Sequence, residues 1–220
     1  MHSDPLRTLF DGAFDAARHS VWGRALAAGL GVDRLVALLG GIEPERVART
    51  VEDVRTHLGP DVPTAALVDE LVRRKALAAA ALAFATGLLP PGVALAAALA
   101  DALVLLGLEL ELVFEIACAG GCDPAHPDRR LEALVVLAGG LGAGRAADAG
   151  AGLARQALTG GLSHFAIDNL ARLVGCQTAR ALVAGGVPVV GAALGAGMGA
   201  AQIALVGRAA AVFYAREAGA

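Results

Sequence analysis

The chain has 220 residues, of which 56% are hydrophobic but only 4% aromatic, so its apolar mass is mainly alanine, leucine and valine, accompanied by 29 glycines. A mean hydropathy of +0.63 excludes a disordered chain. A formal charge of −3 excludes a general nucleic-acid-binding surface, and we expect no nucleic acid among the partners.

The cysteines and the first residues of the sequence indicate a compartment. Three cysteines are too few, and odd in number, for a disulfide framework. The first twenty residues contain three aspartates and no apolar core of a signal peptide. These features predict a cytoplasmic protein, either free or peripheral to the inner face of a membrane.

Residues 1–61 have the charge pattern and punctuation of short amphipathic helices. Glu43-Pro44-Glu45 is typical of a helix start, because proline is tolerated in the first turn and acids favour the positive end of the helix dipole. Gly59-Pro60 ends that helix, and Pro63-Thr64 begins another. The charged side chains of the first of these two helices are expected to form a solvated face.

Residues 62–220 are much more apolar and contain two charge-free runs, 76–100 and 181–207. Pro90-Pro91-Gly92 divides the first run, so neither half reaches the ~20 residues of a membrane-spanning helix. A long helix is predicted from about Val93 to Ala119, ended by Gly120-Gly121. No stretch alternates with a period of two, so we predict an all-α fold: a compact helical bundle with closely packed, Ala/Gly-rich central helices, in which 1–61 and 62–220 form one continuous globular unit.

Three separated segments from Val62 onward resemble the EcsC family. They are AALAFATGLLPPGVALAAALAD (80–101), IACAGGCDPAHPDRRLEALVVLAGG (116–140) and VPVVGAALGAGMGAAQIALVGRAAAVFYAREA (187–218), and their order and spacing carry the resemblance. The resemblance implies a helical fold and membrane association rather than a defined reaction. The sequence departs from the family pattern at Gly120 and Cys122, where aromatics are usual, and at Glu111 and Glu115, where basic or neutral polar residues are expected.

Acidic residues in the long helix form the first candidate site. On a helical projection Asp101, Glu111 and Glu115 share one side, whereas Glu109 points elsewhere. Glu111 and Glu115 repel one another when both are ionised, unless a cation, water or metal lies between them. One interpretation is a carboxylate-lined cavity with catalytic acids that can hold Mg²⁺. The other is a stripe beside the core or a set of salt bridges to arginines further along the chain: Arg145, Arg155, Arg172 and Arg180.

A second polar set lies at His164, Asp168 and Asn169, to which Arg145 can be added as a ligand-binding residue. Because His164 and Asp168 are four residues apart, they can reach one metal ion or bond to each other. Across a bundle, Asp168 could complete a metal site with the two glutamates of the long helix. A structural hydrogen bond between the histidine and the aspartate is the alternative.

Three glycines four residues apart, Gly191, Gly195 and Gly199, form a ridge that permits close approach of another helix or of a flat lipophilic ligand. In a membrane the same ridge would favour helix association, and homo-oligomers are possible. Spanning is not required, because alanine and glycine contribute little insertion energy.

Two functions are compatible with these patterns. The first is a non-catalytic helical protein that associates with membrane or binds lipid or another lipophilic molecule. The second is an enzyme acting on an isoprenoid or acyl substrate in a hydrophobic cavity lined by the carboxylates, for which Mg²⁺ is a candidate cofactor.

Overall fold

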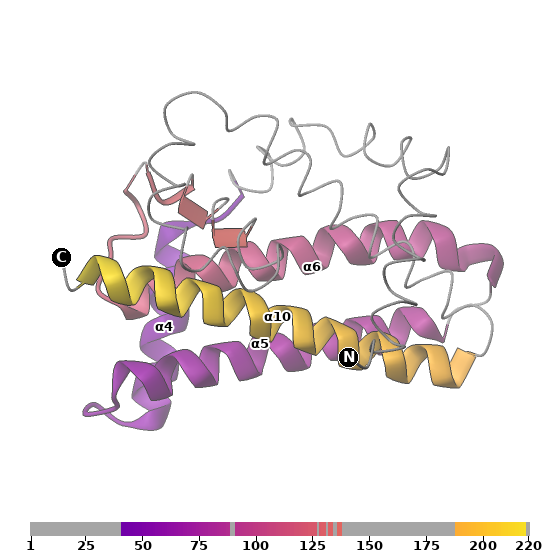
Figure 1. Ribbon diagram of the computed structural model, residues 1–220, viewed down its shortest axis with the longest axis horizontal. Helices are drawn as coiled ribbons and strands as arrows, with labels where there is room; N and C mark the ends of the chain where they lie inside the picture. The colour runs from indigo at the N-terminus through magenta and orange to yellow at the C-terminus, as the bar shows by residue number, and fades with distance from the viewer. Residues whose placement is uncertain are drawn as a thin grey trace, which may run out of the picture.

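The computed structural model describes residues 41–88, 91–126, 128–130, 132–133, 136–137 and 188–218. Every long element in this part of the chain is an α-helix, which confirms the predicted all-α fold (Figure 1). The helices are α4 (Pro44–Leu58), α5 (Thr64–Gly87), α6 (Pro91–Ala119) and α10 (Pro188–Ala218).

The helix ends lie close to where the punctuation predicted them. Helix α4 begins at Pro44 and ends before Gly59, whose φ of +111° is accessible to glycine at little cost. Helix α5 begins at Thr64, after Pro63. The break between α5 and α6 falls at the predicted Pro90-Pro91 pair.

The end of α6 is closed by two reversed hydrogen bonds. The N–H of Cys122 donates to the carbonyl of Ala117, and the N–H of Gly121 donates to that of Cys118, both at 3.0 Å. This is a Schellman motif, and it requires the positive φ of +87° that Gly121 adopts. Cys118 and Cys122 are half-buried and pack against the core. Their sulfurs therefore fill space at a helix end.

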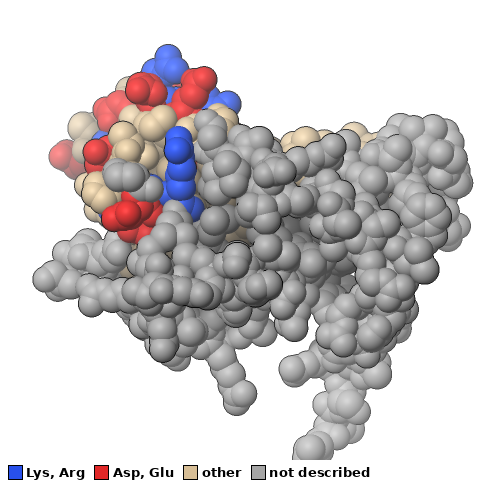
Figure 2. All heavy atoms as spheres, turned by 90° about the horizontal axis from the view of Figure 1, so that it is seen from above, with Lys and Arg blue, Asp and Glu red and all other residues tan. Residues whose placement is uncertain are grey.

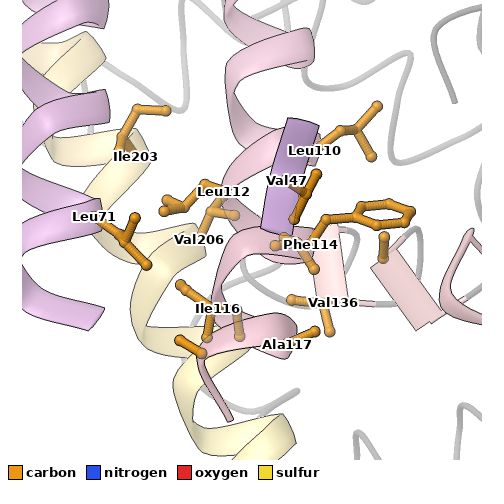
Figure 3. Packing of buried hydrophobic residues seen from close by; sticks show 14 of the residues in the cluster. Val47, Leu71, Leu110, Leu112, Phe114, Ile116, Ala117, Val136, Ile203 and Val206 are labelled. Carbon is orange, nitrogen blue, oxygen red and sulfur yellow. The ribbon is translucent and has the colours of Figure 1, made fainter. Parts of the chain in front are cut away.

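Helix α6 is the centre of the described core. Figure 3 shows Leu112 on the side of Leu71 (α5) and Val206 (α10), and Phe114 on the side of Val47 (α4). Because neighbours lie on both sides, α6 is buried around nearly its whole circumference from Leu110 to Ala117. Polar side chains on this helix are consequently drawn into the interior.

Helices α5 and α10 lie side by side and antiparallel (Figure 1). A Cβ built on Gly87 would lie 2.6 Å from the Cα of Ala192, and one built on Gly199 would lie 3.3 Å from the carbonyl oxygen of Ala79. The two backbones therefore approach so closely that only small residues fit at the contact.

Candidate functional site

Two features of the described structure stand apart from ordinary packing: a buried ion cluster between α4, α5 and α6, and an exposed apolar surface on α5 and α10. In the ion cluster, the ammonium of Lys75 lies 2.7 Å from Glu111 Oε2 and 3.0 Å from Glu115 Oε1. The guanidinium of Arg46 binds the other oxygen of Glu111. Two cations thus balance two carboxylates.

Each member of the cluster occupies a defined position on its helix. Glu111 and Glu115 are one turn apart on α6, and Lys75 ends the charged part of α5 just before its charge-free half. Arg46 belongs to the first turn of α4. The ion pairs relieve the repulsion expected between the two glutamates.

The cations of this cluster differ from the partners expected for the glutamates. The charged side chains of α4 were expected to form a solvated face, and the arginines expected as partners lie outside the described residues. A usable signal was present, because Lys75 is the only lysine of the chain. A lysine at the start of an apolar run must either reach solvent or find a carboxylate.

Glu115 has the least favourable environment for an ionised carboxylate. Only 4% of its side chain is exposed. Burial raises the pKa of Glu115 above its usual value, although the charge of Lys75 acts in the opposite direction. Within the described part of the chain its Oε2 atom accepts no hydrogen bond. The group is therefore easier to protonate than a glutamate in water.

The remaining acids of α6 do not meet at this point. Asp101 is half-buried and lies ten residues before Glu111, which is about 15 Å along a helix axis. Glu109 is buried, as is Glu115. The structure thus brings Glu111 and Glu115 together and leaves Asp101 apart.

The residues described contain no group of three or more His, Cys, Asp or Glu side chains able to hold a metal ion. Between Glu111 and Glu115 the bridging cation is the ammonium of Lys75. The other residues named from the sequence lie outside the described part of the chain: Arg145, His164, Asp168 and Asn169.

Of the glycine ridge, Gly195 and Gly199 face α5. A Cβ on Gly195 would be 3.7 Å from the carbonyl oxygen of Ala83, an ordinary contact, whereas one on Gly199 would be tight against Ala79. Gly191 lies in the first turn of α10. The predicted role of the ridge in close helix approach is therefore observed for the two later glycines.

The exposed apolar surface comprises large side chains that point away from this contact. Leu77 and Phe84 on α5 are 58% and 44% exposed, and Leu194 and Leu205 on α10 are 55% and 53% exposed. Leu88, which caps α5, continues the row. We call these five residues the apolar surface. In Figure 2 the described side chains at the end where α4 lies in Figure 1 include many of both charges.

The fold and these two features define a class: an all-α protein with a tightly packed, small-residue helix pair. Residues 50–216 match the EcsC protein family, and the chain belongs to that family. The match begins twelve residues before Val62, so it includes the second half of α4 as well as the three segments noted in the sequence. No curated protein and no solved structure matches the chain.

Among the described helices, α10 alone has the length and composition to cross a membrane, over Ala192–Ala215. Only 28% of its most apolar stretch is buried. By itself this is weak evidence, because core helices of water-soluble proteins have the same character.

Proposed function

We propose that this protein associates reversibly with membranes, inserting the apolar surface of α5 and α10 into the outer part of a lipid bilayer. The observation that supports this most is the exposure of large apolar side chains on two adjacent helices whose neighbouring segments, 76–88 and 188–207, carry no charge. Large apolar side chains that are exposed to water are unfavourable, and lipid is an occupant that needs no specific side-chain complement.

The packing of α10 supports a peripheral position. Its inner side follows α5 from Ala192 to Gly207, with glycines against the backbone and side chains of α5. Crossing the bilayer would require α10 to leave this contact or to carry the ion-paired part of α5 into hydrocarbon, which is expensive for charged groups. Binding in the plane of the interface keeps both contacts.

Flotation with phosphatidylcholine vesicles tests the proposal. The double variant L77E/F84E places two charges in the apolar surface and should abolish flotation, while its melting temperature stays close to that of the wild type, because both positions are exposed. The control is A48E/T56E, which adds the same two charges at exposed positions of α4. Equal flotation of both variants would refute the assignment of this surface. If L77E/F84E instead converts an oligomer into a monomer with unchanged flotation, the occupant is a second copy of the chain.

Alkaline carbonate treatment of membranes separates peripheral from spanning proteins. We expect the protein to be released, because the proline break separates α5 from α6 and α10 is packed along α5. Retention in the pellet would show that α10 spans the bilayer.

The buried ion cluster favours one alternative function, an enzyme acting on an isoprenoid or acyl substrate. Its supporting observation is Glu115, a buried carboxyl with a raised pKa and an oxygen that accepts no hydrogen bond in the described structure. Such a group can donate a proton to a lipophilic substrate. Mass spectrometry of lipids and metals copurified in detergent-free buffer would test it. A bound isoprenoid or acyl compound lost in Glu115→Gln supports the enzyme, and its retention in that variant removes the role of Glu115.

A further inference from the structure

The contacts between α5 and α10 fix which residues of the two helices lie at the same level. Gly87 faces Ala192 at one end, and Gly207 faces Val72 at the other. Between these two contacts both helices are free of charge over most of their length. Near the second contact, the charge-free part of α5 is bounded by Lys75 and that of α10 is bounded by Arg208. Both helices therefore change from apolar to charged at nearly the same level.

Three arginines are exposed at this boundary. Arg73 and Arg74 follow the same side of α5 as Leu77, and Arg208 lies between Leu205 and Val212 on the exposed side of α10. We call Arg73, Arg74 and Arg208 the arginine belt. Lys75 does not belong to it, because its ammonium points inward to the glutamates of α6.

The arginine belt retains positive charge after its local ion pairs are counted. Arg73 and Arg74 both bind Glu70, at 2.7 and 2.8 Å, and these hydrogen bonds lower the pKa of Glu70 to about 2. One carboxylate thus serves two guanidinium groups. Arg208 has no ion pair within the described part of the chain. When the exposed Asp69 is included, the three arginines of the belt still outnumber the two acidic side chains near them.

We propose that the arginine belt binds the phosphate groups of lipids, so that the protein selects membranes containing anionic phospholipid. A guanidinium offers paired donors that fit phosphate oxygens, and its aliphatic stem can remain in the apolar layer while the charge reaches the headgroups. The belt lies at the end of the apolar surface. With the two helices in the plane of the interface, the arginines therefore lie beside the inserted Leu77 and Leu205 and can reach the surrounding headgroups. This inference rests on the membrane association proposed above and names its lipid class.

The test compares vesicles of phosphatidylcholine alone with vesicles containing equal amounts of phosphatidylcholine and phosphatidylglycerol, at low and high salt. The variant R73Q/R208Q removes two charges and leaves Arg74 to bind Glu70. The matched control R49Q/R55Q removes two exposed or half-exposed arginines of α4, one of which is also paired with a glutamate three residues earlier. Thermal melts of all variants verify folding.

We expect wild type and R49Q/R55Q to prefer the anionic vesicles and to lose that preference at high salt. Binding of R73Q/R208Q to anionic vesicles should fall about thirtyfold, because each arginine near an anionic surface is worth ~1 kcal/mol. Its binding to phosphatidylcholine should equal that of the wild type.

Three results would overturn the inference. Equal anionic preference in R73Q/R208Q and R49Q/R55Q would show that the belt does not select the lipid, while leaving membrane association intact if L77E/F84E still fails to float. Absence of wild-type binding to both kinds of vesicle would refute the membrane proposal and this inference together. Competition by inorganic phosphate as effective as that by anionic vesicles would show that the arginines bind a free anion and not a lipid.

Discussion

The two halves of α5 are attached to their neighbours by opposite means. Near Lys75 the helix is joined by charged side chains to α6, and through Glu111 to the half-exposed Arg46 of α4. From Ala79 to Gly87 it is joined to α10 by small residues that bring the two backbones together. The first contact depends on charge balance, and the second depends on the absence of side chains.

The difference determines what each half can tolerate. A charged contact tolerates changes in side-chain size. It is destabilised when one charge is removed, because the remaining ion is left in a low-dielectric environment without a partner. A small-residue contact is insensitive to pH and salt but fails when atoms are added. The same division leaves the second half of the helix free of charge.

Lys75→Met should give the largest loss. It leaves Glu115 buried without its cation and removes one partner of Glu111, and we expect the free energy of unfolding at pH 7 to fall by about 3 kcal/mol. The loss should become smaller at acidic pH, where the glutamates are protonated. Urea unfolding measures it, with Arg74→Met as the control, since that exposed ion pair should contribute at most about 1 kcal/mol. Equal losses would contradict a special role for the cluster.

Gly195→Leu tests the second half of the helix. A Cβ fits beside Ala83, but the rest of a leucine does not, so the substitution should cost about 2 kcal/mol. The control is Gly197→Leu, two residues away, where no atom lies within 4 Å of an added Cβ and the stability should be unchanged or improved. Similar melting temperatures for both variants would show that α5 and α10 are not in close contact.

Glutamine substitutions of the two clustered glutamates should have smaller and different effects. Glu111→Gln breaks contacts with both Arg46 and Lys75 and should cost about 1 kcal/mol. Glu115→Gln should leave the stability at pH 7 unchanged or raised, because burial opposes ionisation of Glu115. A clear loss of stability in Glu115→Gln would mean that its bond to Lys75 outweighs desolvation.

The raised pKa of Glu115 determines how its contribution to the free energy of unfolding changes with pH. Because the pKa of Glu115 is raised in the folded state, folded protein binds more protons than unfolded protein between 4.5 and the folded pKa. The contribution of Glu115 to stability is therefore present below pH 4.5 and lost as pH rises through this window. The Glu115→Gln variant should lack this loss. The lowered pKa of Glu70 acts in a separate window, with stability lost as pH falls from 4.5 toward 2.

Much of the fold followed from local signals. The start of α4 at Pro44, the break before Pro91 and the end of α6 at Gly120-Gly121 were predicted because proline and glycine restrict or free the backbone independently of distant residues. The EcsC family was also identified from the sequence, through ordered segments and not through any one motif.

The partners of the glutamates did not follow from the sequence. Periodicity indicates that Glu111 and Glu115 share a side of α6, but Lys75 and Arg46 are 36 and 65 residues from Glu111 and belong to other helices. Likewise, the glycine spacing predicts that α10 can approach a neighbour closely, while only the packing shows that the neighbour is α5. The sequence alone therefore determined the helices, their ends and the family, because those depend on local backbone preferences and patterns. The tertiary structure decided which charges pair and which apolar side chains remain exposed, because both depend on which helices are adjacent.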